Sequence, residues 1–171
     1  NPIKGLETLI HAVSALNKQF DNLAFVVVGP IFASQQRYFE QLQKLCNELC
    51  VDNVEFVGAR HDVRPLLARF NIFVCSSRAE SSPIAVWEAM SMGKAIVSTD
   101  VGDVPLYVRH DINGFVIDVG DSKKMSNHIS ELIQKESLRL NFGNISRDIA
   151  IHELDAYLCA ERHLDAISSF G

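Results

Sequence analysis

The sequence predicts an α/β protein whose parallel β-sheet carries helices on both faces. Short continuous runs of apolar and β-branched residues alternate with longer segments whose apolar residues recur at helical spacing. Such runs are typical of parallel strands buried on both faces, and their alternation with helices implies right-handed βαβ units. Because the chain has 171 residues, we expect residues 1–171 to form a single domain.

The first part of the chain predicts two helix–strand pairs. Residues 6–20 predict a helix, and the run LAFVVVG at 23–29 predicts a buried strand that ends in Gly-Pro. Residues 35–50 predict a second helix, and VEFVG at 54–58 predicts the next strand. The apolar stripes of the two helices consist of Leu6, Leu9, Ile10, Val13 and Leu16, and of Phe39, Leu42, Leu45, Cys46 and Leu49.

The second part continues the alternation. Asp62 is expected to cap a short helix that runs through Phe70. Pro83 suits the first position of a helix, with Ser82 as its N-cap. Strands are expected at 71–77 (NIFVCSS), 94–100 (KAIVSTD) and 114–119 (GFVIDV), the last entered through an Asn-Gly turn. Closing helices are expected at about 121–135, 137–149 and 152–168.

Composition indicates an ordinary soluble globular chain. Hydrophobic residues make up 47% and charged residues 22%, and the net charge is −5 with both signs mixed along the chain. No basic run suggests a nucleic-acid partner, and no stretch has the roughly 18–20 apolar residues of a membrane span. The chain opens without methionine or a signal peptide, so we interpret it as a fragment of a cytoplasmic protein.

The four cysteines, Cys46, Cys50, Cys75 and Cys159, form no close Cys-x-x-Cys pair. Cys46 and Cys50 are four residues apart and are expected to share a helix face. Small buried apolar side chains are the favoured interpretation, ahead of metal binding or a disulfide. A reducing compartment fits this usage.

Ligands of parallel sheets bind beyond the carboxyl ends of the strands, so the segments that follow each strand are the candidates for a site. No Gly-x-Gly-x-x-Gly and no Gly-x-x-x-x-Gly-Lys-Ser/Thr is present, which weakens dinucleotide dehydrogenases and P-loop phosphotransferases. Arg60 and the Gly102-Asp103 turn lie at this edge, and Lys4 comes just before the first predicted helix. A solvated lysine, an arginine paired with Asp62 and a simple turn are their plain alternatives.

The stretch ESSPIAVWE carries two glutamates, Glu80 and Glu88, around an apolar interior. Glu80 lies in the loop before the helix, where free N–H groups favour anions and polar ligands. Glu88 lies inside a helix that is apolar nearly all round, so a buried carboxylate there would need donors from protein or ligand. The alternative places Glu88 on an exposed stripe with Ile84 and Ser91. Both interpretations remain open on physical grounds alone.

Several segments, in order, resemble a known family. KGLETLIHAV, LAFVVVGP, VEFVGARHDVRPLLARFNIFVCSS, ESSPIAVWEAMSMGKAIVSTDVG and INGFVIDVGD are similar to the C-terminal, nucleotide-sugar-binding domain of retaining glycosyltransferases of group 1, also called family 4. The resemblance runs from residue 1 to about 135, and the spaced glutamates followed by Ala-Met-x-x-Gly are its most specific part. It implies the Rossmann-like C-terminal half of a GT-B fold.

The resemblance also implies roles for residues of this sequence. Glu80 would hold hydroxyls of the donor sugar, Glu88 the ribose hydroxyls, and Lys4 the diphosphate. Arg60 would pack by the nucleotide base, and Gly102 would line the phosphate pocket. Backbone N–H groups of a short segment would approach the sugar and diphosphate; its residues are Ser81, Ser82, Pro83 and Ile84.

The implied activity is transfer of a hexosyl unit from a UDP- or GDP-sugar with retained anomeric configuration. Lys4 and Glu80 would be the catalytic residues, and no metal or other cofactor is expected. The acceptor would be a glycan or lipid-linked glycan held by an N-terminal domain, which with the first strand of this domain would precede residue 1. The fragment alone is expected to be inactive. Peripheral association of the full protein with the cytoplasmic face of a membrane would be compatible with this role.

The sequence departs from the family pattern at several positions. Glu-Ser-Ser stands where the family often has Glu-Gly-Phe, and Ser76 stands where it usually has proline. Asp103 replaces a common second glycine, and Leu106 replaces a common glutamate. Two alternatives therefore stay open: a non-hydrolysing sugar-nucleotide epimerase of the same fold, and a non-catalytic binding module derived from it.

Overall fold

The computed structural model describes residues 1–155, 160, 164 and 165. The helices in this part of the chain are α1 (Leu6–Leu16), α2 (Gln36–Glu48), α3 (Arg64–Arg69), α4 (Ile84–Ser91), α5 (Val104–Tyr107), α6 (Ser122–Gln134) and α7 (Glu136–Glu153). The strands are β1 (Phe25–Val28), β2 (Val54–Gly58), β3 (Ile72–Cys75), β4 (Ala95–Thr99) and β5 (Gly114–Ile117). Two 3-10 turns, Pro2–Lys4 and Ala33–Gln35, complete the order.

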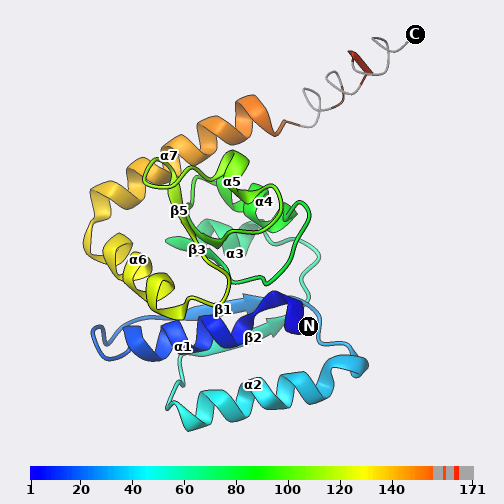
Figure 1. The fold of residues 1–171 in the computed structure, drawn as a ribbon, viewed down its shortest axis with the longest axis vertical. Coiled ribbons are helices and arrows are strands. Elements are labelled where there is room, and N and C mark those ends of the chain that lie inside the picture. Colours follow the sequence, from blue (N-terminus) through cyan, green and yellow to red (C-terminus); the bar gives the residue numbers. More distant parts are fainter. Residues whose placement is uncertain (156–159, 161–163, 166–171) are drawn as a thin grey trace.

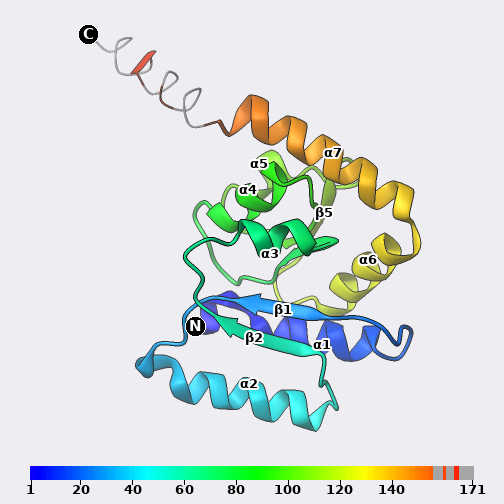
Figure 2. The ribbon, with the colours of Figure 1, turned by 180° about the vertical axis from the view of Figure 1, so that it is seen from behind.

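The strands are parallel, as expected, but they form two sheets where the sequence predicted one. β1 pairs with β2, and β3, β4 and β5 pair in that order. Phe25 lies opposite Val54 in the first sheet, and Ile72 lies opposite Ala95 in the second. Figures 1 and 2 show β1 and β2 with α1 and α2 in one half of the molecule, and β3–β5 with α4 and α5 in the other.

The two sheets are separated because β1 and β3 do not pair with each other. A cavity of about 690 Å³ lies between them. Its walls include residues 23–26 on the β1 side and 71–74 on the β3 side, with further side chains from α1, α3 and α6. Among the described residues, β1 and β3 therefore each have one edge without a strand partner.

Helix packing joins the two halves. α1 contacts α6, and α6 also contacts β4 and β5. One buried cluster consequently contains residues of both halves, among them Ile10 and Val13 of α1, Val97 of β4 and Phe115 of β5. α1 lies in front of β1 and β2 in Figure 1, and α3 lies on the opposite side of the molecule (Figure 2). Helices thus cover both faces of the strands, as the sequence predicted.

Several element boundaries differ from expectation. The predicted break between helices 137–149 and 152–168 is wrong, because α7 runs without interruption from Glu136 to Glu153. The remainder of 152–168 lies largely outside the described residues, as does Cys159. The turn-like α5 was not expected; Pro105 in its first turn is compatible with a helix start.

The cysteine interpretation holds for Cys46, which is buried, and fails for Cys50, which is exposed. Helix α2 ends at Glu48, and Cys50 adopts a left-handed backbone conformation with φ of 54°. The chain therefore leaves the helix before Cys50, and the side chain cannot continue the apolar stripe. No described helix is both long and apolar enough to cross a membrane.

Candidate functional site

The predicted edge of the sheets gathers the chain segments expected to bind ligand. Loops that follow β3 and β4 meet there, and the N-terminal turn Pro2–Lys4 joins them. The Arg78 N–H donates to the Ile3 carbonyl at 2.6 Å, and the Ser76 hydroxyl donates to the Lys4 carbonyl at 2.9 Å. In Figure 2 the N-terminus accordingly lies beside the arrowhead ends of β1 and β2.

Lys4 and Glu80 form the centre of this edge. The Lys4 ammonium donates to Glu80 Oε1 at 2.6 Å, although 76 residues separate them in the chain. The Ser77 hydroxyl donates to the same carboxylate oxygen at 2.7 Å. Burial by itself would raise the pKa of Glu80, but hydrogen bonds from Lys4 and Ser77 outweigh it and hold that pKa below its ordinary value. Glu80 is therefore an ionised acceptor at neutral pH.

Gly102 packs directly on the backbone beside Glu80. Its φ is 50°, and a Cβ at this position would lie 2.6 Å from the Glu80 carbonyl oxygen and closer still to that of Ser81. The next residue, Asp103, donates its N–H to the Ser81 carbonyl at 2.9 Å. The two loops can approach this closely only because residue 102 has no side chain. Gly102 thus fixes the backbone of Glu80 and Ser81 in the loop between β3 and α4, which we call the glutamate loop.

Ser81, Ser82, Pro83 and Ile84 lead into α4, which begins at Ile84 with Pro83 as N-cap. The expectation that Ser82 caps this helix is wrong, because its hydroxyl accepts a hydrogen bond from the Trp87 indole at 3.1 Å. The N–H groups of Ser81 and Ser82 have no hydrogen-bond acceptor among the described residues. Both residues are exposed and follow Glu80 directly in the chain.

Glu88 lies on the exposed stripe of α4 that was the alternative to burial. Its side chain is exposed, together with Ile84 and Ser91, while Val86, Ala89 and Met90 turn inward. The carboxylate makes no hydrogen bond or ion pair within the described residues. Helix α4 is thus buried on one side only, and Glu88 needs no protein donors to offset burial. An exposed carboxylate on the first turns of a helix that starts at the site is nevertheless available to a ligand.

Arg60 lies two residues beyond the end of β2, where the sequence placed it. Its guanidinium contacts the Ala59 carbonyl at 3.3 Å, and the side chain is exposed. The alternative that Arg60 pairs with Asp62 is wrong, because Asp62 accepts hydrogen bonds from the Arg64 side chain at 2.8 Å and from the Arg64 N–H at 3.0 Å. The expectation that Asp62 caps α3 is wrong, because the N-cap of α3 is Val63 and the helix begins at Arg64. Arg60 does not contact Lys4 or Glu80.

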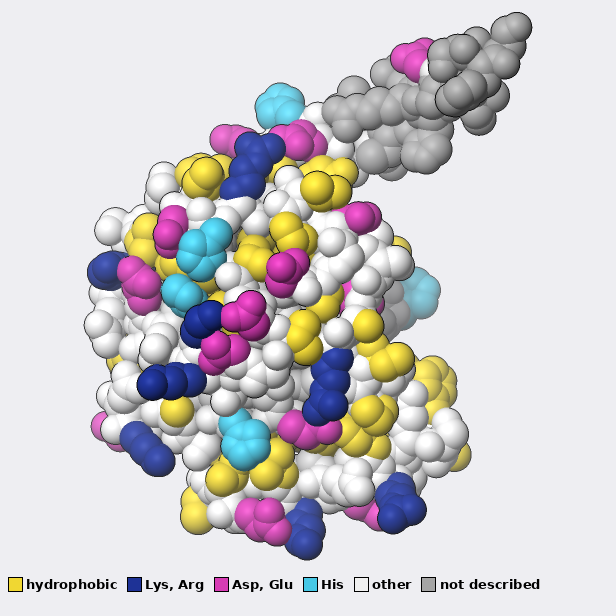
Figure 3. Space-filling model, viewed as in Figure 1, with side chains coloured by type: hydrophobic (Ala, Val, Ile, Leu, Met, Phe, Trp, Pro, Cys, Tyr) yellow, Lys and Arg dark blue, Asp and Glu magenta, His cyan; other side chains and the backbone are white. Residues whose placement is uncertain are grey.

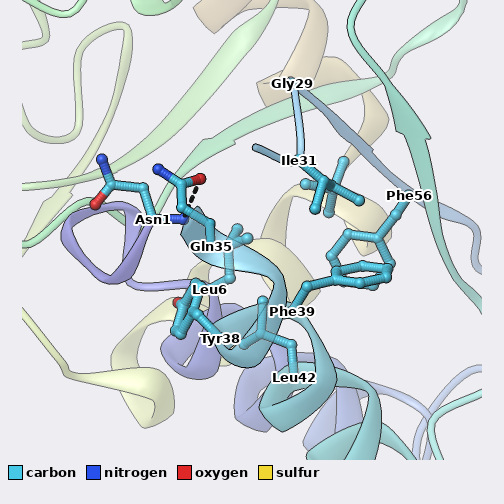
Figure 4. A pocket seen from close by; sticks show the side chains of 10 residues that line it. Asn1, Leu6, Gly29, Ile31, Gln35, Tyr38, Phe39, Leu42 and Phe56 are labelled. Carbon is cyan, nitrogen blue, oxygen red and sulfur yellow. Dashed lines mark hydrogen bonds between the residues drawn. The ribbon is translucent and has the colours of Figure 1, made fainter. Parts of the chain in front are cut away.

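A small cavity lies next to the N-terminal turn, between α2 and the ends of β1 and β2 (Figure 4). It measures about 50 Å³, and its lining is mostly apolar, with Ile31, Phe39 and Phe56 at one side. The Asn1 ammonium donates to Gln35 Oε1 at 3.2 Å at its rim. Ligand pockets for small molecules usually measure roughly 300–1,000 Å³, so this cavity is too small to hold a nucleotide sugar.

Ser77, Arg78 and Thr99 form hydrogen bonds at the site, and the sequence did not indicate a role for them. Thr99 is buried at the end of β4, and its hydroxyl donates to the Ser77 carbonyl at 2.7 Å. All three residues stand at a strand end or just after one, so the rule that selected Glu80 could also have selected them. The partners of Thr99 and Arg78 are distant in the chain and leave no mark in local sequence. The partner of the Ser77 hydroxyl, Glu80, is three residues away in the same loop.

Side chains of one charge do not gather into a single patch on the face drawn in Figure 3. Lys and Arg side chains are interspersed there with Asp and Glu side chains. No group of three or more His, Cys, Asp or Glu among the described residues could hold a metal ion. Lys4 and the N–H groups of Ser81 and Ser82 supply local hydrogen-bond donors at this edge.

The fold is that of the C-terminal domain of GT-B glycosyltransferases. The chain belongs to the family of group 1 glycosyl transferases, whose model matches residues 1–149. It is 27% identical over 167 residues to the lipopolysaccharide core biosynthesis glycosyltransferase LpsE of Rhizobium meliloti, covering 97% of this chain and 46% of that protein. The chain thus spans less than half the length of this relative.

Solved structures support the same assignment. The crystal structure of Anabaena Alr3699/HepE in complex with UDP matches 99% of this chain and 46% of its own, with a TM-score of 0.92 and 25% sequence identity. The same protein has been crystallised with UDP-glucose. A sucrose-phosphate synthase from Thermosynechococcus elongatus, 20% identical, matches 99% of this chain and 43% of its own with a TM-score of 0.88, which shows the shared fold.

Proposed function

We propose that this chain is the donor-binding half of a retaining hexosyltransferase that uses a nucleotide-diphosphate sugar. The observation that carries the proposal is the Lys4–Glu80 pair at the carboxyl edge, with the free N–H groups of Ser81 and Ser82 beside it. A cation, an ionised acceptor and backbone donors are the groups that a diphosphate and a sugar together require. The UDP and UDP-glucose complexes of the Anabaena protein are compatible with this ligand class.

Each predicted residue has a role in this proposal. The Lys4 ammonium binds the diphosphate, and the Glu80 carboxylate accepts hydrogen bonds from sugar hydroxyls. The Glu88 carboxylate, which has no partner within the described residues, accepts hydrogen bonds from the ribose hydroxyls. Arg60 lies by the base, and Gly102 keeps the glutamate loop close to the phosphates.

The reaction proposed is exchange of one C–O bond at the anomeric carbon. The bond from that carbon to the diphosphate breaks, and its electron pair stays on the diphosphate oxygen. A hydroxyl oxygen of the acceptor forms the new bond on the same face and loses its proton to the departing diphosphate. Lys4 and the N–H groups stabilise the charge that develops on the leaving group. Removing one such donor typically costs ~10²–10³-fold in rate.

Calorimetric titration with UDP, UDP-glucose and GDP-mannose tests the binding step. Lys4→Ala is expected to weaken binding of every nucleotide diphosphate, and Glu80→Gln to weaken only the sugar-bearing ligands. Lys44→Ala serves as the control, because Lys44 is an exposed lysine of α2 that pairs with Glu48 away from the site. Equal losses in Lys4→Ala and Lys44→Ala would contradict the assignment.

The catalytic part is tested on the full-length protein with a labelled donor. A product with the donor's anomeric configuration supports retaining transfer. A sugar nucleotide epimerised at carbon 2 would instead support the epimerase alternative. Binding without turnover, for every acceptor offered, would support the non-catalytic module. The chain described here is proposed to bind donor without transferring it.

We further propose that an acceptor-binding domain covers the carboxyl edge in the full protein and presents a glycan or lipid-linked glycan there. The proposal is compatible with large apolar side chains that are exposed in segments following three of the strands. Phe32 follows β1, Ile84 follows β3 and Leu106 follows β4, and they are 58%, 69% and 63% exposed. Phe32→Ser in the full-length protein is expected to weaken this contact.

One more parallel strand between β1 and β3 is also proposed. From the usual strand rise, strand spacing and layer thickness, a strand residue fills roughly 160 Å³, so the cavity of about 690 Å³ holds about four residues. Four residues match the lengths of β1 and β3. In the full-length protein, backbone amides of both strands should then exchange with solvent as slowly as those of β4; rapid exchange would contradict the proposal.

A further inference from the structure

The segment Ser76–Arg78, which we call the clasp, contacts both members of the Lys4–Glu80 pair. It follows β3 directly, and both of its serines are buried. The Ser76 hydroxyl donates to the Lys4 carbonyl at 2.9 Å, and the Ser77 hydroxyl donates to Glu80 Oε1 at 2.7 Å. The Arg78 N–H adds a hydrogen bond of 2.6 Å to the Ile3 carbonyl. Two adjacent side chains thus each hold one partner of the pair.

The clasp is itself held in place. The Thr99 hydroxyl, fully buried on β4, donates to the Ser77 carbonyl at 2.7 Å. Gly5 packs closely against the backbone of the clasp, because a Cβ at Gly5 would overlap the Ser76 carbonyl oxygen. The Arg78 guanidinium reaches Glu7 of α1 at 3.6 Å. The strand end and the first helix therefore limit how far either serine can move.

We propose that Ser76 and Ser77 are positioning residues: Ser76 sets the turn that carries Lys4, and Ser77 keeps Glu80 aimed at the sugar when Lys4 turns to the diphosphate. The inference rests on the proposed function. Without ligand, Lys4 and Glu80 satisfy each other at 2.6 Å. A diphosphate would draw the Lys4 ammonium away, because Lys4 is 54% exposed and can rotate. Glu80 is only 17% exposed, and its other side-chain partner within the described part of the chain is the Ser77 hydroxyl.

The two serines therefore have separable effects on binding. Loss of the Ser76 hydroxyl frees the Lys4 turn, so Ser76→Ala is expected to weaken UDP and UDP-glucose alike. Loss of the Ser77 hydroxyl frees only the carboxylate that contacts the sugar, so Ser77→Ala is expected to weaken UDP-glucose and leave UDP unchanged. Loss of one hydrogen bond corresponds to a roughly three- to tenfold loss of affinity.

Ser126→Ala is the matched control. Ser126 of α6 is 3% exposed, as Ser77 is, and its hydroxyl also makes a single hydrogen bond, to the Lys123 carbonyl. A merely structural serine of this kind should not change the ratio of the two affinities. If Ser77→Ala lowers UDP and UDP-glucose affinity equally, or lowers neither, the role assigned to Ser77 is wrong. If Ser76→Ala leaves both affinities at the wild-type values, the role of Ser76 is wrong.

A second measurement needs no ligand. Because the Ser77 hydroxyl helps to lower the pKa of Glu80, Ser77→Ala should move the carboxyl titration of Glu80, followed by carbon NMR, toward higher pH. An unchanged titration would overturn the inference whatever the ligands do. A wild-type protein that binds neither UDP nor UDP-glucose, with the titration shifted as expected, would instead count against the proposed function and leave the clasp in place.

Discussion

Substitution of Gly102 by alanine tests how the two loops of the site depend on close packing. The added Cβ would lie 2.6 Å from the Glu80 carbonyl oxygen and nearer to that of Ser81. Neither obstacle is a flexible side-chain end, so the backbone of the glutamate loop has to move. Gly120→Ala is the matched control, because Gly120 also has a positive φ, of 85°, but a Cβ there would meet no other atom within 4 Å.

The expected magnitude follows from the difference between the two variants. The left-handed backbone costs an alanine ~1–2 kcal/mol, and reduced freedom of the unfolded chain returns ~0.4–1 kcal/mol. Both terms apply to both glycines and largely cancel. The steric overlap at Gly102 adds ~1–3 kcal/mol, typical of an overpacked site. For a protein of this length, that difference corresponds to a Tm lower by ~2–12 °C in Gly102→Ala than in Gly120→Ala.

The assay is urea unfolding followed by far-UV circular dichroism, with thermal scans of both variants and titration with UDP-glucose. Gly102→Ala should also bind UDP-glucose more weakly, because the moved backbone carries Glu80 and the N–H groups beside it. The reasoning is refuted if the two variants have the same free energy of unfolding. It is equally refuted if Gly102→Ala is destabilised but binds UDP-glucose as the wild type does.

Two further predictions concern Asn113 and Glu80. The Asn113 side chain is fully buried, accepts a hydrogen bond from the Arg109 N–H at 2.7 Å and donates one to the Tyr107 carbonyl at 3.1 Å. Asn113→Ala should therefore lower the free energy of unfolding, measured in urea, by ~1–3 kcal/mol. A loss no larger than that of Asn47→Ala, at an exposed asparagine, would argue against this. The folded-state pKa of Glu80 lies below the ordinary value of 4.5, so its contribution to stability is present above pH 4.5 and is lost as the pH falls through the lowered pKa. Glu80→Gln should therefore remove part of the acid dependence of stability, and identical acid unfolding profiles for the two proteins would contradict this.

Local patterns predicted most of the secondary structure. The strand at 54–58 has the bounds expected from VEFVG, and the buried runs at 71–77 and 94–100 contain β3 and β4. Errors occurred where tertiary contacts or single backbone conformations decide the outcome. Cys50 itself has a left-handed backbone conformation, and the Ser82 hydroxyl accepts a hydrogen bond from the Trp87 indole instead of capping the helix.

The candidate site shows the same division. That candidate ligand residues follow the strands could be inferred from the alternation of elements, because parallel strands present their carboxyl ends at one edge. Which face of α4 carries Glu88 could not be inferred, since the helix is apolar nearly all round and periodicity gives no preferred side. The structure places Glu88 outward with Ile84 and Ser91.

The sequence by itself determined the class of fold, the order of its elements and the edge where a ligand would bind, because these depend on hydrophobic periodicity and chain connectivity. Only the tertiary structure decided that β1 and β3 leave a gap between two sheets, that Lys4 meets Glu80, and that Ser77 holds the same carboxylate. The Lys4–Glu80 contact joins residues 76 positions apart, and the Ser77–Glu80 contact depends on the conformation of the loop after β3. Hydrophobic periodicity therefore predicts neither contact.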